Sequence, residues 1–227
     1  MFLNYYPKES HLVASQGIKR VGSTRGENEK KGSTIMVACE MFQSAMLSLS
    51  LGMTAQCNGT LAQQYSNWEG TACATFQPQH WMDKVECLLY LEFLKECYPD
   101  EKVGLIWDAA TSHICDEVIA RAESLGIVLG FIPPGCTSLI QVCDLIANKP
   151  IKQTFKKSYV SFKLKNDPGP GGKYKISRDD IILWLEIAVE DFNKKMGPSK
   201  AIGKAFGCYG QDFRTTDITA LMSYLGK

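Results

Sequence analysis

The first third of the chain carries short segments in which apolar and polar residues alternate. Residues 46–54 (MLSLSLGMT) change character at nearly every position, which is the period of a strand with one buried face. Residues 17–25 and 33–42 are further strand candidates, and the polar, glycine-bracketed residues 26–32 predict the turn between them. The pattern therefore predicts an antiparallel meander, followed by a long loop or insertion over residues 56–80.

A helix is predicted directly after this region. Asp83 and Glu86 have the spacing of a capping box, and Pro99 ends the helix. Its predicted apolar face consists of Val85, Leu88, Leu89, Leu91 and Leu94. A face of this width predicts that the helix packs against a core.

Two apolar runs, 103–107 (VGLIW) and 127–132 (IVLGFI), flank a second predicted helix over residues 114–125. Continuous apolar runs of this length are typical of strands that are buried on both faces. Gly126 ends the helix between them. Strand, helix and strand therefore form a βαβ unit with parallel strands and a right-handed connection.

The last part of the chain has a helical pattern. One helix passes through Asp144, and Pro150 is expected to kink or end it. Residues 165–173 are rich in glycine and proline and form a linker, after which helices are predicted over 178–195 and 199–206. This order of elements predicts an α/β fold, with a mixed sheet that has an antiparallel edge and helices on both faces.

Composition adds exclusions rather than a function. The 227 residues are 45% hydrophobic and 22% charged, and the net charge of +1 leaves only local charge to indicate a nucleic-acid partner. No apolar run approaches the roughly 18 residues of a membrane helix, and no secretory signal opens the chain, so no membrane partner is expected. The nine cysteines form no CxxC pair and no zinc spacing with the three histidines. They are expected to be reduced thiols in a nuclear or cytoplasmic protein.

Two aspartates stand near the ends of the predicted βαβ strands. Asp108 follows the run 103–107 directly, and Asp144 lies on the helix after the next strand. Ligands of open α/β sheets bind beyond the carboxyl ends of the strands, so both carboxylates are placed to share one crevice that suits Mg²⁺ or Mn²⁺. The competing interpretation is structural, because an Asp after a strand is often a turn residue or helix cap, and a helical Asp is usually solvated.

Several segments, in the same order, resemble the DDE transposases of the pogo, Tigger and jerky group, relatives of centromere protein B. They are Tyr6-Pro7, Gly17-Ile18-Lys19-Arg20-Val21, His80-Trp81-Met82-Asp83, Trp107-Asp108 with His113 five residues after the Asp, and residues 132–150 (IPPGCTSLIQVCDLIANKP). Val142 and Cys143 depart from the group, which usually has Pro and Leu there. The resemblance covers about residues 5–160 and extends more weakly to Phe206. It implies an RNase H-like fold and metal-dependent cleavage and transfer of DNA strands.

The resemblance implies roles for five residues. Asp108 and Asp144 correspond to the second and third acids of the catalytic triad and would hold Mg²⁺ or Mn²⁺. His113, Gln141 and Asn148 would orient these ligands or position the substrate. His113 is equally open to interpretation as a helix cap, and Asn148, one turn after Asp144, as a residue that only stabilises the helix.

The first acid of that triad has no counterpart in the sequence. In the group it precedes the Tyr-Pro segment by a few residues, and nothing acidic precedes Tyr5-Tyr6-Pro7. We therefore expect an N-terminally truncated RNase H-like DDE domain over 1–164, a linker over 165–177 and a helical extension over 178–227, with impaired cleavage. Glu40, on a later strand, is a candidate substitute that no motif supports.

Basic residues dominate the stretch after Asp144. Between Lys149 and Arg178 there are nine basic residues and one acid, Asp167. The residues expected to contact DNA are Lys149, Lys152, Lys156, Lys157, Lys163 and Lys165. Such a segment neutralises phosphates without reading the base sequence, whereas the alternative is a solvated surface helix with a linker behind it.

The predicted function is therefore DNA binding by a transposase-derived domain in the nucleus. An active DDE transposase whose start lies further upstream is one alternative. A host protein that uses the fold as a non-catalytic interaction module is another, and a homodimer is left open. No glycine-rich phosphate loop follows any predicted strand, which disfavours an unrelated nucleotide enzyme.

Overall fold

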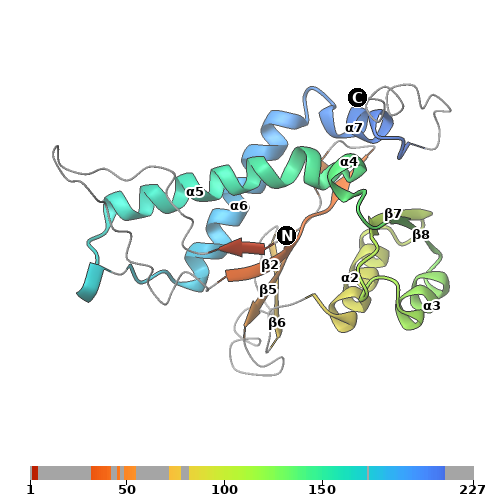
Figure 1. Cartoon of the computed structure of the whole chain (residues 1–227), viewed down its shortest axis with the longest axis horizontal. Coiled ribbons are helices and arrows are strands. Elements are labelled where there is room, and N and C mark those ends of the chain that lie inside the picture. The colour runs from red at the N-terminus through yellow and green to blue at the C-terminus, as the bar shows by residue number, and fades with distance from the viewer. Residues whose placement is uncertain are drawn as a thin grey trace.

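The structure, a computed structural model, describes residues 2–4, 32–41, 45–46, 49–54, 72–77, 82–172 and 174–212. In this part the chain is a mixed α/β fold (Figure 1), which confirms the predicted class at that level. No helix among the described residues is long and apolar enough to cross a membrane. The predicted strand 17–25 and most of the turn after it lie outside the described residues.

The larger sheet has four strands in the order β1-β2-β5-β6. β1 (Phe2–Asn4), β2 (Gly32–Met36) and β5 (Leu49–Thr54) are antiparallel neighbours. The pairing of β2 with β5 confirms that part of the predicted meander, whereas β1 lies where no strand was predicted. β6 (Ala72–Gln77) pairs in parallel with β5, so the prediction of a loop is wrong there. Its sequence, ACATFQ, gives a weak strand signal, and pairing with β5 decides its conformation.

The predicted βαβ unit is confirmed. β7 (Val103–Asp108) and β8 (Ile127–Ile132) are parallel neighbours on either side of α3 (Asp116–Ser124), and Gly126 (φ +72°) ends that helix. The prediction that these strands are buried on both faces is wrong, since the Val128 side chain of β8 is 71% exposed. α2 and α3 cover one face of the pair, while the other carries an apolar hollow of about 250 Å³.

The described strands fall into three sheets, where the sequence predicted one mixed sheet. The third is the antiparallel pair of β3 (Cys39–Glu40) and β4 (Ala45–Met46). Residues 35–39 nevertheless run like a central strand between two cores. Ile35, Val37 and Cys39 face a core built by α5 and α6, whereas Met36 and Ala38 face a core built by α2, α3 and β7. Alternating side chains thus bind the two halves together.

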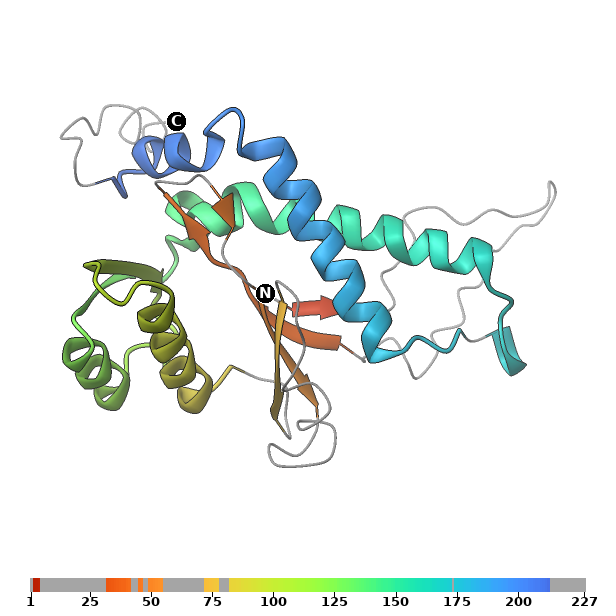
Figure 2. The same cartoon turned by 180° about the vertical axis from the view of Figure 1, so that it is seen from behind.

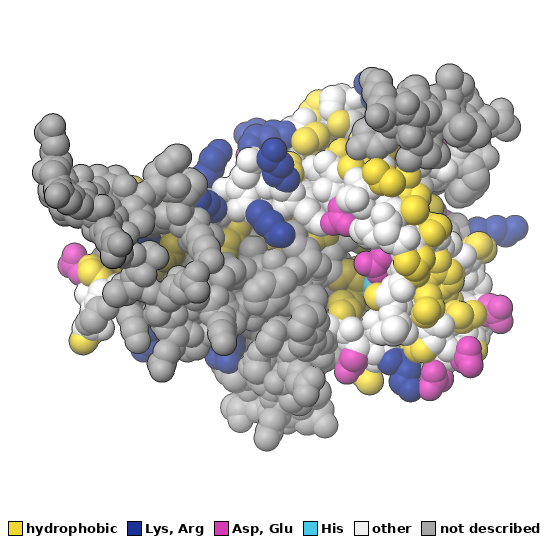
Figure 3. Space-filling model, viewed as in Figure 1, with side chains coloured by type: hydrophobic (Ala, Val, Ile, Leu, Met, Phe, Trp, Pro, Cys, Tyr) yellow, Lys and Arg dark blue, Asp and Glu magenta, His cyan; other side chains and the backbone are white. Residues whose placement is uncertain are grey.

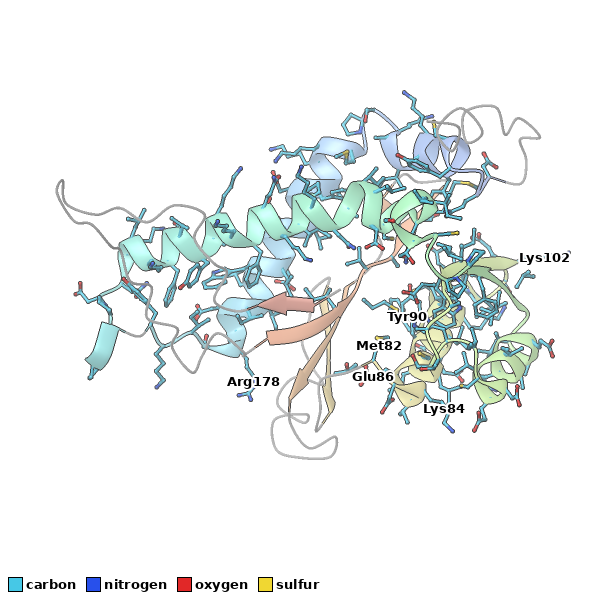
Figure 4. The ribbon with its side chains drawn as sticks, in the orientation of Figure 1. Met82, Lys84, Glu86, Tyr90, Lys102 and Arg178 are labelled. Carbon is cyan, nitrogen blue, oxygen red and sulfur yellow. The ribbon has the colours of Figure 1, made fainter. Side chains whose placement is uncertain are left out.

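α2 (Lys84–Cys97) starts where the sequence predicts. The Asp83 carboxylate accepts hydrogen bonds from the backbone N–H groups of Val85 and Glu86. Glu86 does not complete a capping box; its carboxylate accepts a 2.6 Å hydrogen bond from Thr75 and points from α2 toward β6 (Figure 4). The predicted face is wrong at Val85 and Leu89, which are more than half exposed, because Cys87 and Tyr90 are buried in their place.

Three helical segments follow β8: α4 (Thr137–Ile140), the π-helix η2 (Cys143–Ala147) and α5 (Asn148–Lys165). Pro150 was expected to kink or end a helix, but it lies in the first turn of α5. Proline lacks an N–H group and clashes with the carbonyl four residues before it. The wider π-turn just before Pro150 relieves this clash, so the helix continues.

The C-terminal helices pack onto α5. α6 (Arg178–Met196) begins at a capping box between Ser177 and Asp180 and crosses α5, as Figure 2 shows from behind. Its predicted apolar stripe, consisting of Ile181, Leu185, Ala188, Val189 and Phe192, is buried. The 3₁₀ turn η3 (Pro170–Gly172) lies in the linker, and α7 (Ala201–Cys208) contacts β3. α6 and α5 therefore share one core with Ile35 of β2.

Candidate active site

Asp108 is the last residue of β7, and His113 holds it in place. The Nδ1 atom of His113 lies 2.7 Å from the Asp108 carboxylate and 3.0 Å from the Asp108 carbonyl oxygen. The imidazole ring also stacks on Trp107, with centroids 4.4 Å apart and planes 2° from parallel. The N-cap of α3 is Cys115, so His113 is not the helix cap that the structural interpretation proposed.

The pair is strongly polarised. Burial lowers the pKa of His113, but its contacts with the Asp108 carboxylate, the Cys87 side chain and the Asp108 carbonyl raise it to about 10. The contact with His113 in turn lowers the pKa of Asp108, against the effect of burial. His113 is therefore an imidazolium at neutral pH, paired with the Asp108 carboxylate.

This pairing predicts a pH dependence of stability in metal-free buffer. A group whose pKa is raised on folding stabilises the fold below its unfolded pKa, and this stability is lost as the pH rises through the folded pKa. The free energy of unfolding should therefore fall between pH 6.5 and about 10. Because the Asp108 side chain is 40% exposed, the fall should be about 2–3 kcal/mol rather than the full value of the shift.

The measurement is urea unfolding across that range, with His113→Asn as the reference. The variant should be less stable at pH 6 and should lack this part of the pH dependence, while all other titrating groups remain the same. Parallel curves for the two proteins would contradict the ion pair.

Asp144 lies in η2, where its side chain is exposed. The Asn148 amide Nδ2 donates a hydrogen bond to the Asp144 carboxylate from one helical turn further on. Asn148 therefore holds the rotamer of Asp144, and η2 is the element that aims it. π-Turns of this kind are frequent at functional sites.

The two aspartates follow the same ends of neighbouring strands. Asp108 pairs in register with Ile132, the last residue of β8, and η2 comes after β8. α2 lies near both aspartates. Its Cys87 side chain contacts His113, the partner of Asp108. One turn further along α2, Tyr90 interacts electrostatically with Cys143, the residue before Asp144. Figure 3 shows acidic side chains where the β7–β8 unit meets the start of α5.

Buried oxygen atoms accompany these carboxylates. Within the described residues, the Gln141 Oε1 and Asn148 Oδ1 atoms are buried and have no hydrogen-bond partner. Such acceptors are costly unless a donor reaches them, and the water molecules around a divalent cation are suitable donors. These two carboxylates and two carboxamides offer only oxygen donors, the ligand type that Mg²⁺ and Mn²⁺ prefer.

No third acid joins this group in the part of the chain that the structure describes. No cluster of three His, Cys, Asp or Glu residues has the geometry of a metal site there. Glu40, the candidate substitute, instead lies beside the Tyr98 side chain. Burial and this contact raise the pKa of Tyr98 to about 12. Glu40 is thus occupied at the end of α2.

The six predicted DNA-contacting lysines all lie on α5, but they do not share one face. Spacings of 3, 4 and 7 residues place four of them within an arc of about 60°. These four, which we name the Lys stripe, are Lys149, Lys152, Lys156 and Lys163. Basic side chains are seen along α5 in Figure 3. The stripe begins one residue after Asn148, next to the candidate metal site.

The remaining two lysines belong to other surroundings. Lys157 lies toward α6, where it helps Lys195 and Thr154 to lower the pKa of Asp191. Lys165 ends the helix on a different side. Within the stripe, Lys163 lies over the rings of Tyr159 and Tyr174, at 5.7 and 5.6 Å from their centroids. Cation–π contacts of this kind hold the ammonium group in a fixed position.

Sequence reasoning missed two residues of the site. Trp107 supports the ring of His113, and Cys87 contacts it from α2. Trp107 was placed in a strand and in the Trp107-Asp108 motif without being given a role, and Cys87 was treated only as a reduced thiol. The signal for Trp107 was its place directly before Asp108; Cys87 gave none, because its contact depends on how α2 packs.

Comparison with known protein families identifies a family for most of the chain. The profile of the family described as DDE superfamily endonuclease matches residues 30–197, which include β2 to α6 and every candidate site residue. No curated protein and no solved structure matches the chain.

Proposed function

Because the chain belongs to the DDE superfamily endonuclease family, we propose that it binds DNA along the Lys stripe and acts on a phosphodiester bond at Asp108 and Asp144. The observation that carries this proposal is the order of groups along one continuous segment. Asp144 and Asn148 lie at the start of α5, and four lysines follow on one side of the same helix. The proposed metal site and the proposed DNA-binding surface are therefore adjacent on the protein.

The residues of the site have separate tasks. A bound Mg²⁺ or Mn²⁺ would polarise the phosphate and activate water. Asp108 would supply one carboxylate, kept in position by His113. Asp144 would supply the second, kept in position by Asn148. The free carboxamide oxygens of Gln141 and Asn148 would accept hydrogen bonds from water molecules at the site.

The stripe has the dimensions of a backbone contact. From Lys149 to Lys163 it extends for about 21 Å at 1.5 Å per residue. This length corresponds to about six base-pair steps of 3.4 Å. Point charges on flexible side chains bind phosphates without reading bases, so the proposed binding has no sequence preference.

Three finer parts of the proposal follow from the sequence resemblance. They are an RNase H-like arrangement, membership of the pogo, Tigger and jerky group, and a nuclear location. The resemblance also supports weak cleavage, since the triad's first acid has no counterpart in the motif order. A non-catalytic DNA-binding role is the second candidate, favoured by the absence of a three-acid cluster among the described residues.

Plasmid nicking tests the chemistry. We expect slow, Mn²⁺-dependent nicking of supercoiled plasmid that is lost in Asp144→Asn. A version extended upstream to include a further acid should nick on the order of 10³-fold faster, because loss of one ligand from a preorganised site costs several kcal/mol. Nicking that persists in Asp144→Asn would refute the assigned site, and DNA binding without nicking in either version would favour the non-catalytic role.

A further inference from the structure

Two cysteines lie close together where η2 packs against residues 37–39. The Cys143 thiol donates a 3.4 Å hydrogen bond to the Val37 carbonyl oxygen. Cys39 lies two residues after Val37 on the same face of the chain, which places its thiol next to that of Cys143. The neighbouring Cys143 thiol and burial both raise the pKa of Cys39. Both cysteines are free thiols and half-buried.

We propose that Cys39 and Cys143 form a reversible oxidation site that controls the position of Asp144. Hydrogen peroxide would oxidise one thiol to a sulfenic acid and release one water molecule. The sulfur of the second thiol would then attack the sulfenic sulfur, and the hydroxyl group would leave as a second water molecule with the thiol proton. In total, two thiols lose two electrons and two protons, and one peroxide becomes two water molecules.

The other described cysteines lack this arrangement. Cys87 is fully buried against the α2–α3 core, and Cys115 donates to the Ser112 carbonyl oxygen. Cys97 and Cys208 are exposed. Among the described residues, Cys39 and Cys143 are thus the neighbouring thiols, and they come from segments more than 100 residues apart.

A bond between these thiols must move η2. A disulfide has a sulfur–sulfur distance of about 2.05 Å, and unbonded sulfur atoms come no closer than van der Waals contact, so the two thiols must approach by more than about 1 Å. Val142 is 2% exposed and anchors one side of Cys143, while Asp144 follows on the exposed side. The displacement is therefore expected at Asp144. A shift of about 1 Å at a metal ligand is enough to weaken a preorganised site.

Bond formation itself is independent of the proposed function, whereas its effect on Mn²⁺ rests on it. The experiment treats the full chain with hydrogen peroxide, blocks free thiols and maps peptides without reduction. We expect a peptide pair linked through Cys39 and Cys143 that dithiothreitol separates. Mn²⁺ affinity should be about tenfold lower in the oxidised protein and should recover on reduction.

Variants separate the outcomes. Cys39→Ser should show neither the linked peptide nor the loss of affinity, while Cys97→Ser should behave as the wild type. No linked peptide, a link to another cysteine, or oxidation of Cys143 alone would overturn the oxidation site. A linked peptide with unchanged Mn²⁺ affinity would overturn its control of Asp144. If the reduced protein does not bind Mn²⁺, the proposed metal site is wrong. Amide hydrogen exchange then tests whether oxidation moves η2, and unchanged protection of η2 on oxidation would overturn the proposed control of Asp144.

Discussion

Asp144→Asn is expected to weaken Mn²⁺ binding by at least about 100-fold, because a hard cation depends on the charge of its few carboxylate ligands. The amide keeps the size of the side chain and can still pair with Asn148, so folding should be unaffected. Asp144 is exposed and contributes little to the core. Titration of Mn²⁺ by calorimetry or by water proton relaxation measures the change.

Asp108→Asn should have a similar effect on the metal, but it also removes the charge that pairs with His113. It should therefore lower stability as well as metal affinity, and Asp144→Asn should lower only the affinity. Asp100→Asn is the matched control, since Asp100 is exposed in the loop between α2 and β7. Equal Mn²⁺ affinity in Asp144→Asn and Asp100→Asn would rule out a metal site at Asp144.

The helices were predictable because their apolar spacing and caps are local. α6 shows this well: Ser177 caps it, and the five residues of its predicted stripe are buried. The βαβ unit was predictable for a similar reason, since its two apolar runs and Gly126 lie within thirty residues of one another. Sequence patterns of this kind do not depend on contacts with distant parts of the chain.

Features that depend on distant contacts were not predictable. β6 is a strand because β5 pairs with it, and Val85 is exposed because Tyr90 takes the buried side of α2. The division of the strands into separate sheets likewise reflects how residues 35–39 pack between the two cores. The prediction that Pro150 kinks or ends the helix was wrong for another reason. A proline near the start of a helix is tolerated, and the sequence does not show that α5 starts just before Pro150, after the π-turn.

The candidate site was predictable in its residues but not in its geometry. Motif order selected Asp108, His113, Gln141, Asp144 and Asn148. The structure adds that His113 pairs with Asp108 and that Asn148 pairs with Asp144. It also divides the basic segment, which the sequence treated as one patch, into a stripe and a remainder. Charge counting cannot make this division, because helical phase decides which lysines point together.

That division gives the second large effect. Replacing Lys152 and Lys156 by Gln should reduce the salt dependence of duplex binding, the slope of log affinity against log salt, by about 2, because each phosphate contact contributes roughly 0.9. At low salt the affinity should fall by on the order of 100-fold, equally for unrelated DNA sequences. Fluorescence anisotropy over a range of salt concentrations measures both quantities.

The control is a second double variant on the same helix. Replacing Lys157 and Lys165 by Gln changes the net charge by the same amount, yet Lys157 lies near Asp191 and Lys165 lies off the stripe. Its slope should therefore change by less than about 0.5. Equal changes in the two variants would mean that DNA responds to the total charge of α5 rather than to the stripe. No change in either would place the DNA elsewhere on the protein, since the lysines next to Asp144 would then touch no phosphate.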